Sequence, residues 1–268
     1  MRNLLFMGAL MGVLATAPGQ ARAQAEQQAI VDRATLAVQE LLLPSERAEN
    51  VTPLLRRARA VMVCPRLFRA GFIFGGQGGD CLLVARDGGG SWSSPAFYTM
   101  GSGSVGFQIG VQDSQVMMIV LTERGLNAIM DSQFKVGADA SVAFAHLGAG
   151  VQGATTAAVG ADIVTFARTR GLYAGLSLEG SILNFRSADN RAYYGRDVSA
   201  RGLVVGMEAH NPGADPLRAI LMRYAGQGAA TAAANPPAAT PAPAASSGRA
   251  PRPAPVQQEA LPTPPRAR

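Results

Sequence analysis

The stretch from residue 60 to residue 86, AVMVCPRLFRAGFIFGGQGGDCLLVAR, decides the fold, because the hydrophobic period changes here from helical to strand-like. Its apolar residues fall into short runs separated by proline or glycine, a pattern typical of strands joined by turns. The runs are Val61–Cys64, Gly71–Phe74 and Cys81–Arg86, and a fourth follows at Trp92–Tyr98. Asp87-Gly88 and the glycines after it predict a hairpin turn before this fourth run.

Cys64 and Cys81 are the only cysteines of the chain. They form no CxxC pair, and a zinc site would need more cysteines and histidines than the chain contains. In an exported protein, two cysteines on neighbouring strands can form a disulfide. The alternative is that both are small, buried hydrophobic side chains.

Further along the chain, apolar residues alternate with small or polar ones. Val105, Phe107, Ile109 and Val111 alternate with Gly106, Gln108, Gly110 and Gln112. This period of two predicts a strand over residues 104–112 with one buried face and one small, polar face that a backbone or ligand could approach. More strands are expected at Val116–Leu121, Ala140–Ala145, Asp162–Arg168 and Leu176–Phe185, and helices after Thr122-Glu123 and from Asp215-Pro216 to about Tyr224.

Before residue 60 the pattern is helical. In Glu26–Leu43 the residues Ile30, Ala34, Ala37 and Leu41 fall on one stripe, so we expect an amphipathic helix that Pro44 ends. Thr52 followed by Pro53 predicts the N-cap of a short second helix. Residues 26–225 therefore predict one α+β domain: antiparallel and β-rich, with an N-terminal amphipathic helix and short flanking helices.

The two ends of the chain differ from this domain. A short positive start, the apolar run Leu4–Leu14 and two small-x-small cleavage patterns before residue 26 predict a signal peptide over residues 1–25. The run is too short to span a bilayer, so we expect no transmembrane segment in the mature chain. No cysteine stands immediately after the signal peptide, since the first is Cys64, so we expect an exported protein, periplasmic or secreted, that is not a lipoprotein. Residues 226–268, rich in proline and alanine, predict a disordered tail that is a spacer, an adhesive arm or without specific role.

The formal net charge of +6 lies mostly outside the domain. Residues 26–225 hold almost equal numbers of basic and acidic side chains. Nucleic acid is therefore not the expected partner, because binding a duplex requires a basic face.

No group of residues indicates catalysis. Gly101–Gly106 matches the letters of GxGxxG, but a strand pattern rather than a helix follows it, which argues against a dinucleotide site. His146 and His210 are the only histidines and have no metal-ligand spacing. Aspartates such as Asp80 and Asp139 occupy turn positions. We expect no catalytic residue, no metal site and no cofactor.

One segment does concentrate positive charge. Between residues 56 and 69 the chain has five arginines, no acid, and two interleaved apolar residues: Arg56, Arg57, Arg59, Arg66, Leu67, Phe68 and Arg69. Arginine beside exposed apolar groups suits an anionic membrane surface. The alternative is a solvated helix face and strand edge, with the arginine stems covering the core.

An ordered set of motifs resembles the SYLF domain family, which occurs as exported proteins in bacteria and as lipid-binding, actin-regulating modules in eukaryotes. In chain order the motifs are Arg57-Ala58-Arg59-Ala60-Val61 with Pro65, Gly71–Gly76, Gly106–Gln112, Asp162-Ile163, Gly171–Gly180, Asp189-Asn190 and Tyr193-Tyr194-Gly195. Each motif is loose alone, but the ordered set is specific.

The resemblance implies a non-enzymatic domain that binds anionic lipids such as phosphoinositides, in eukaryotes through an N-terminal amphipathic helix and basic residues. Here the helix at 26–43 carries only Arg33 as a base, so the arginines between residues 56 and 69 would have to form the positive patch. For an exported protein, anionic phospholipid is the nearer ligand. The second hypothesis is a structural or interaction module whose strand at 104–112 packs against an envelope protein or a second copy.

Overall fold

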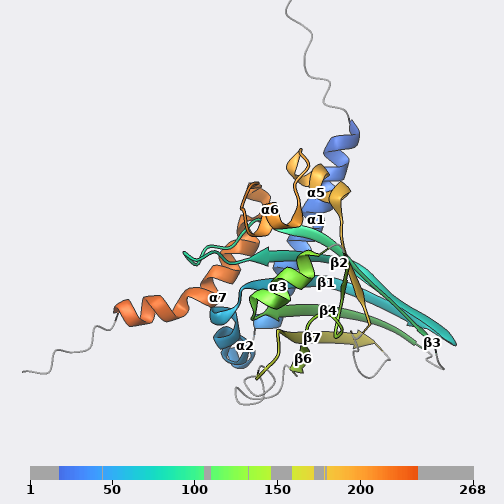
Figure 1. Cartoon of the computed structure of the whole chain (residues 1–268), viewed down its shortest axis with the longest axis horizontal. Helices are drawn as coiled ribbons and strands as arrows, with labels where there is room; N and C mark the ends of the chain where they lie inside the picture. Colours follow the sequence, from blue (N-terminus) through green and yellow to red (C-terminus); the bar gives the residue numbers. More distant parts are fainter. Residues whose placement is uncertain are drawn as a thin grey trace, which may run out of the picture.

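The structure of the chain, a computed structural model, describes residues 18–43, 45–105, 110–131, 133–145, 159–171, 178 and 180–234. Within them the centre of the fold is one curved, eight-stranded sheet (Figure 1). Its strands are β1 (Ala60–Gly71), β2 (Phe74–Ala85), β3 (Ala96–Val105), β4 (Gly110–Val120), β5 (Gln133–Lys135), β6 (Val142–Ala145), β7 (Ile163–Gly171) and β8 (Ile182–Phe185). They lie in the order β5-β8-β3-β2-β1-β4-β7-β6, antiparallel except for β6 and β7. The predicted α+β class is confirmed.

Helices pack on both faces of the sheet. They are α1 (Pro18–Leu42), α2 (Ser45–Arg57), α3 (Glu123–Met130), α5 (Ser187–Tyr194), α6 (Ala200–Val204), the 3-10 turn η1 (Pro212–Ala214) and α7 (Asp215–Ala234). Of the helices in the described segments, none is long and apolar enough to cross a membrane. Figure 1 shows strands β1 to β4 running on together past the helices, so the sheet has one end among helices and one free end.

The hairpin of β1 and β2 lies at the centre of the sheet. In its half nearer the helices, both faces are buried. Val61 and Val63 belong to the core shared with α1, α2 and α7, whereas Met62 and Cys64 belong to the opposite core, shared with α3 and α6. Burial on both faces explains why the apolar run starting at Ala60 is continuous. Each fully buried side chain of this size contributes roughly 1.5–3 kcal/mol.

A β-bulge interrupts β1 at Pro65 and Arg66. Its register shifts between Val63 and Phe68 against β2, and between Cys64 and Leu67 against β4. Proline suits this place because it has no N–H to donate to the sheet. On β2, a Cβ at Gly79 would lie 2.0 Å from the main-chain oxygen of Arg66. Only glycine allows β2 to approach the bulge this closely.

The run Gly71–Phe74, predicted as one strand, instead contains the turn of this hairpin: β1 ends at Gly71, Phe72 and Ile73 form the turn, and β2 begins at Phe74. Gly71 pairs with Gly75, and the Phe72 amide donates to the Phe74 carbonyl at 3.2 Å. The prediction was wrong because two aromatics and an isoleucine resemble a buried strand, and turn residues are normally polar. The consequence is an apolar turn at the free end of the sheet.

Two predicted helix starts are confirmed, and of the two alternatives left open for the cysteines the structure shows the disulfide. Cys64 and Cys81 form a disulfide across β1 and β2, with their Cα atoms 4.1 Å apart and both side chains buried. The Thr122 side chain accepts the Gly125 amide at 3.0 Å and so caps α3. Helix α7 begins at Asp215. The disulfide lies in the buried half of the hairpin.

Several predicted boundaries were wrong. Helix α2 begins at Ser45 and contains Pro53, so Thr52 is not an N-cap. The strand expected over 104–112 is divided between β3 and β4, which have different neighbours, and residues 106–109 lie outside the described residues. Strand β3 begins at Ala96, and Trp92 makes only an isolated bridge to Arg86.

The termini test the predicted ends of the domain only in part. Helix α7 continues to Ala234, so residues 226–234, expected in the tail, are helical, while 235–268 lie outside the described residues. The apolar run Leu4–Leu14 also lies outside them. Helix α1 begins at Pro18 and includes the expected cleavage patterns. Signal-peptide cleavage stays a prediction.

Candidate functional site

The seven residues predicted to bind lipid do not form one patch. Arg56 and Arg57 end α2, and Arg59 precedes β1, whereas Arg66 to Arg69 lie in its second half. At about 3.3 Å per residue, β1 separates Arg59 from Arg69 by roughly 30 Å. The predicted set is therefore divided between the helix-covered end and the free end of the sheet.

The three arginines at the helix-covered end have ordinary structural roles. Arg56 and Arg57 lie in the last turn of α2, where positive charge stabilises the helix dipole. Arg59 Nε lies 3.2 Å from Glu123 Oε1 in an exposed ion pair, an interaction that contributes about 0–1 kcal/mol. We do not include these three residues in the candidate site.

Leu67 is also not part of the candidate site. Its side chain is 1% exposed and belongs to the core shared with α3 and α6. The bulge turns Leu67 inward and its neighbours Arg66 and Phe68 to the opposite face. A buried leucine has no surface to offer a membrane, so its role is to anchor β1.

Among the described residues at the free end of the sheet, five large apolar side chains are exposed. They are Phe68 (46%), Phe72 (57%), Ile73 (50%), Phe74 (75%) and Val111 (53%), and we call them the distal patch. Four come from the β1–β2 hairpin and one from β4. Large exposed apolar patches are uncommon on soluble proteins and mark interaction sites.

Strand register places the distal patch on one face. Ala70 pairs with Gly76 on β2 and with Val111 on β4. Paired residues share a face, and residues two apart along a strand return to it. Phe68, Phe74 and Val111 therefore share the face that α1 covers nearer the middle of the sheet, with Phe72 and Ile73 at its end.

Glycines keep the surface beside the distal patch flat. Gly76 of β2 pairs with Gly103 of β3, and Gly78 with Gly101. Without side chains on these positions, the aromatic rings of Phe68 and Phe74 stand above the neighbouring strands. The small face predicted on residues 104–112 is not this surface: Val111, expected to be buried, is 53% exposed, and Gln112, expected on the small face, is 2% exposed. The flat glycine surface lies instead on β2 and β3, and a broad partner surface could reach the rings.

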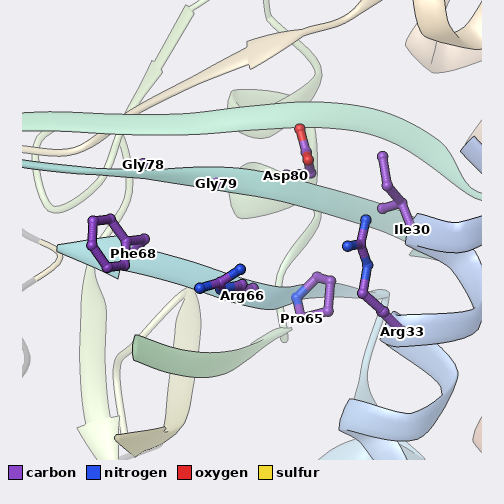
Figure 2. Close-up of a pocket in the computed structure, with 8 residues that line it drawn as sticks. All are labelled: Ile30, Arg33, Pro65, Arg66, Phe68, Gly78, Gly79 and Asp80. Carbon is purple, nitrogen blue, oxygen red and sulfur yellow. The ribbon is translucent and has the colours of Figure 1, made fainter. Parts of the chain in front are cut away.

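Arginines border the distal patch on its α1 side, around two adjoining cavities. The first, of about 390 Å³, is lined by Ile30, Arg33, Pro65, Arg66, Phe68, Gly78, Gly79 and Asp80. Figure 2 shows Arg33 of α1 and Phe68 of β1 at opposite sides of this space, with Arg66 between them. The second, of about 260 Å³, shares Arg33, Pro65 and Arg66 and adds Arg168 and Arg170 of β7. We call the two cavities together the arginine groove.

Ion pairs compensate part of the positive charge of the arginine groove. Arg66 Nε lies 2.6 Å from Asp113 Oδ2, and its guanidinium stands 5.9 Å from the Phe68 ring centroid. Arg168 and Arg170 share one acceptor, Glu40 Oε2, at 3.1 and 3.4 Å. Arg33 makes no ion pair with any residue that the structure describes.

The most perturbed carboxylate of the described residues is structural. Asp162 is almost fully buried, and its oxygens accept from Arg124, Thr122 and Ser141. These bonds, the Arg124 bond first, hold the pKa of Asp162 well below its usual range. Its acceptor positions are occupied by residues that join α3 to β7, so Asp162 offers no free base for catalysis.

Other buried polar residues likewise support the fold. The Asn190 side chain accepts the Phe97 amide at 3.0 Å and donates to the Phe97 and Arg186 carbonyls, so it replaces a missing strand neighbour of β3. Burial raises the pKa of the Tyr193 and Tyr194 hydroxyls. These residues lie in the motifs that resemble the SYLF family, and their contacts stabilise the fold.

The described residues contain no cluster of His, Cys, Asp or Glu that could hold a metal ion. His210 lies beside Ser94 and Arg218, and His146 is outside the described residues. The cavity beside His210, of about 700 Å³, is lined by Tyr193, Arg191 and other residues of α5 and η1. None of its lining residues is a serine, cysteine, lysine or carboxylate.

Sequence reasoning missed most of the candidate site. It identified Arg66 and Phe68, but not Phe72, Ile73, Phe74, Val111, Arg33, Arg168 or Arg170. Arg69, the remaining predicted residue, lies on β1 but belongs to neither the distal patch nor the arginine groove. A signal existed in the glycines on both sides of Phe72-Ile73-Phe74, which favour a hairpin turn. The three distant arginines had no local signal, because only sheet order brings β7 and α1 to β1.

A protein-family model matches the second half of the domain. Residues 101–224 match the Ysc84 family, described as Las17-binding protein actin regulator. This range includes the second half of β3 and all of β4 and β7, but not the β1–β2 hairpin, so it covers only part of the candidate site.

Curated proteins from yeasts and animals are similar over a longer range. The SH3 domain-containing protein PJ696.02 of Schizosaccharomyces pombe is 34% identical over 192 residues, which are 70% of this chain and 43% of that protein. Protein YSC84 of Saccharomyces cerevisiae is 32% identical over 179 residues, 65% of this chain and 38% of the relative. The human SH3 domain-containing YSC84-like protein 1 is 32% identical over 156 residues, 58% and 46% respectively. The chain thus spans less than half the length of these relatives, and no solved structure matches it.

Proposed function

We propose that this chain, a member of the Ysc84 or SYLF family, is a non-enzymatic module that binds the surface of anionic phospholipid membranes with its distal patch. The observation that carries the proposal is the exposure of Phe72, Ile73 and Phe74 at the free end of the sheet, while Phe68 of the same patch lines the arginine groove. Apolar side chains enter the boundary between headgroups and acyl chains, while basic groups attract the anionic surface. The distal patch and its arginine border bring both groups together.

The size of the two contributions fits reversible binding. Full burial of a side chain as large as phenylalanine contributes roughly 1.5–3 kcal/mol, and half-exposed residues contribute about half of that. A basic group near an anionic membrane contributes about 1 kcal/mol. The loss of rotational and translational freedom opposes these gains. We expect affinity that depends on both salt and lipid charge.

Vesicle co-sedimentation tests the proposal. The full chain is mixed with phosphatidylcholine vesicles with or without about a fifth phosphatidylglycerol, at low and at physiological salt. We expect binding to the anionic vesicles that weakens as salt screens the charges. Equal binding to both vesicle types, or binding indifferent to salt, would contradict the proposal.

A second candidate function is protein binding through the same patch. The matched family is described as Las17-binding and actin-regulating, and exposed aromatic and arginine side chains are also typical of protein interfaces. The structural module of the envelope predicted from the sequence is one form of this function. Retention of the wild-type chain but not a Phe72→Ser/Phe74→Ser variant by a defined protein partner, without any vesicle binding, would favour it.

We also propose export to the periplasm or the medium. The proposal rests on the expected signal peptide over residues 1–25. Mass spectrometry of the protein from a bacterial host separates the outcomes: a new N-terminus at Gln24 or Glu26 supports export, whereas an intact N-terminus in the cytoplasm contradicts it.

A further inference from the structure

We infer that the arginine groove is a phosphate site, which receives the headgroup phosphate of an anionic phospholipid; the lipid source rests on the proposed function, whereas the phosphate chemistry does not. The groove lies between α1 and the free half of the sheet. Guanidinium groups reach it from three elements that are distant in sequence: α1, β1 and β7.

The second cavity of the groove has an excess of positive charge. Its lining includes Arg33, Arg66, Arg168 and Arg170, against the carboxylates Glu40 and Asp113. In the first cavity, Asp80 is already paired with Arg186, whose Nη1 lies 2.5 Å from Asp80 Oδ1. Arginines thus outnumber carboxylates in the part of the cavity lined by Arg33 and Arg170. A bound anion would neutralise this excess of positive charge.

The donor geometry favours a phosphate group. Guanidinium presents a rigid fork of N–H donors that matches two phosphate oxygens, and Arg33 has no acceptor among the described residues. Arg168 and Arg170 share a single carboxylate oxygen, so their remaining N–H groups can donate elsewhere. A cavity of about 260 Å³ is small for a drug-sized ligand but holds a phosphate group.

The position of the groove suits the headgroup layer. From Arg66 to the hairpin turn at Gly71, β1 rises roughly 16 Å at about 3.3 Å per residue. Apolar groups of interfacial proteins are buried about 5–10 Å into the boundary between headgroups and acyl chains. With Phe72 to Phe74 at that depth, the groove lies level with the headgroups or just outside them. The long arginine side chains can then reach the phosphates.

Two double variants of equal charge test the site. Arg33→Gln/Arg170→Gln removes two groove arginines, whereas Arg56→Gln/Arg57→Gln removes two arginines from the other end of β1. Binding to phosphatidylcholine vesicles with phosphatidylglycerol is measured for both. We expect the groove variant to bind about tenfold more weakly or worse, because each charge-assisted bond is lost. The control should change less than about twofold, since its arginines lie beyond the Debye length of about 8–10 Å.

Soluble anions separate the two sources of phosphate. The wild-type chain is titrated with inorganic phosphate, and with acetate at equal ionic strength, while NMR signals of the arginine Nε–H groups are followed. We expect phosphate, more than acetate, to shift the Arg33 and Arg170 signals and to displace the chain from vesicles. Thermal unfolding of each variant checks that the fold is retained. A third variant, Arg33→Lys/Arg170→Lys, keeps the charge without the fork and should bind with intermediate affinity.

The outcomes distinguish the site from the proposed function. Equal weakening in both glutamine variants, no weakening in the groove variant, or a lysine variant that binds like wild type would overturn the phosphate site and leave membrane binding intact. Phosphate-induced shifts at Arg33 and Arg170 without vesicle binding would support the site for free phosphate and reject the membrane function. No response to phosphate and no vesicle binding would reject both.

Discussion

Phe74 provides the sharpest test of the distal patch, because its side chain is 75% exposed at the free end of the sheet. The exposed ring makes few contacts in the folded protein, so Phe74→Ser should change the free energy of unfolding by less than about 0.5 kcal/mol. In membrane binding, three quarters of the roughly 1.5–3 kcal/mol for a buried phenylalanine should be lost, about 1–2 kcal/mol. At about 1.4 kcal/mol per factor of ten, the vesicle partition coefficient should fall roughly 5- to 30-fold.

The assay combines vesicle co-sedimentation with thermal unfolding. Phe74→Ser leaves the arginines in place, so binding should fall at every salt concentration without a change in salt dependence. Met222→Ser, on an exposed residue of α7 that is 48% exposed, is the matched control and should bind like wild type. The reasoning would be refuted by unchanged partition of the Phe74 variant, or by an equal fall in both variants.

Two further predictions concern the fold that holds the site. Gly79→Ala should destabilise the protein by about 1–3 kcal/mol in chemical unfolding, since its Cβ would meet the Arg66 main-chain oxygen at 2.0 Å. The control Gly103→Ala, with nothing within 4 Å of its Cβ, should change the free energy of unfolding by less than about 0.5 kcal/mol. Equal effects of the two substitutions would contradict the close approach of β2 to the bulge. Asp162→Asn should cost about 2–3 kcal/mol at neutral pH, because the amide cannot accept from Arg124, Thr122 and Ser141 together. The pKa of Asp162 is lowered by folding, so its contribution is full above the unfolded value of about 3.9 and is lost as pH falls below it. The difference between wild type and variant should therefore be constant above about pH 5 and shrink in acid, and a difference that grows in acid would contradict the assignment.

The helix-covered end of the sheet was largely predictable from sequence, because the signals for it lie close together in the chain. Burial on both faces makes β1 continuously apolar from Ala60, and the capping oxygen of Thr122 lies next to the helix that it starts. Such signals are contained within a few residues. The Cys64–Cys81 pair was predictable only as one of two alternatives, because pairing depends on the register of two strands.

The free end of the sheet was not predictable, because there the usual correlation between apolarity and burial is reversed. Phe72, Ile73 and Phe74 have the composition of a core strand and were interpreted as one, whereas they form an exposed turn. The arginines of the groove come from α1, β1 and β7, which become neighbours only through the order β1-β4-β7 and the packing of α1. Long-range arrangement of this kind leaves no mark on a local sequence pattern. The departure from local rules falls at the proposed functional site, where such departures are expected.

The bulge at Pro65 and Arg66 connects the two halves physically. Before it, Cys64 belongs to the core shared with α3 and α6, and after it Leu67 belongs to the same core, although residues an odd number apart in a regular strand face opposite sides. One extra residue has therefore reversed the alternation of the strand. In a regular strand of the same sequence, without the bulge, Phe68 would point toward the disulfide side and Leu67 toward α1. The bulge thus places Arg66 and Phe68 on the α1 face beside Arg33 while Leu67 anchors the strand, and Gly79 is the residue that allows β2 to accommodate it. Pro65 and Gly79 together explain how a buried hairpin can end in an exposed, arginine-bordered apolar surface.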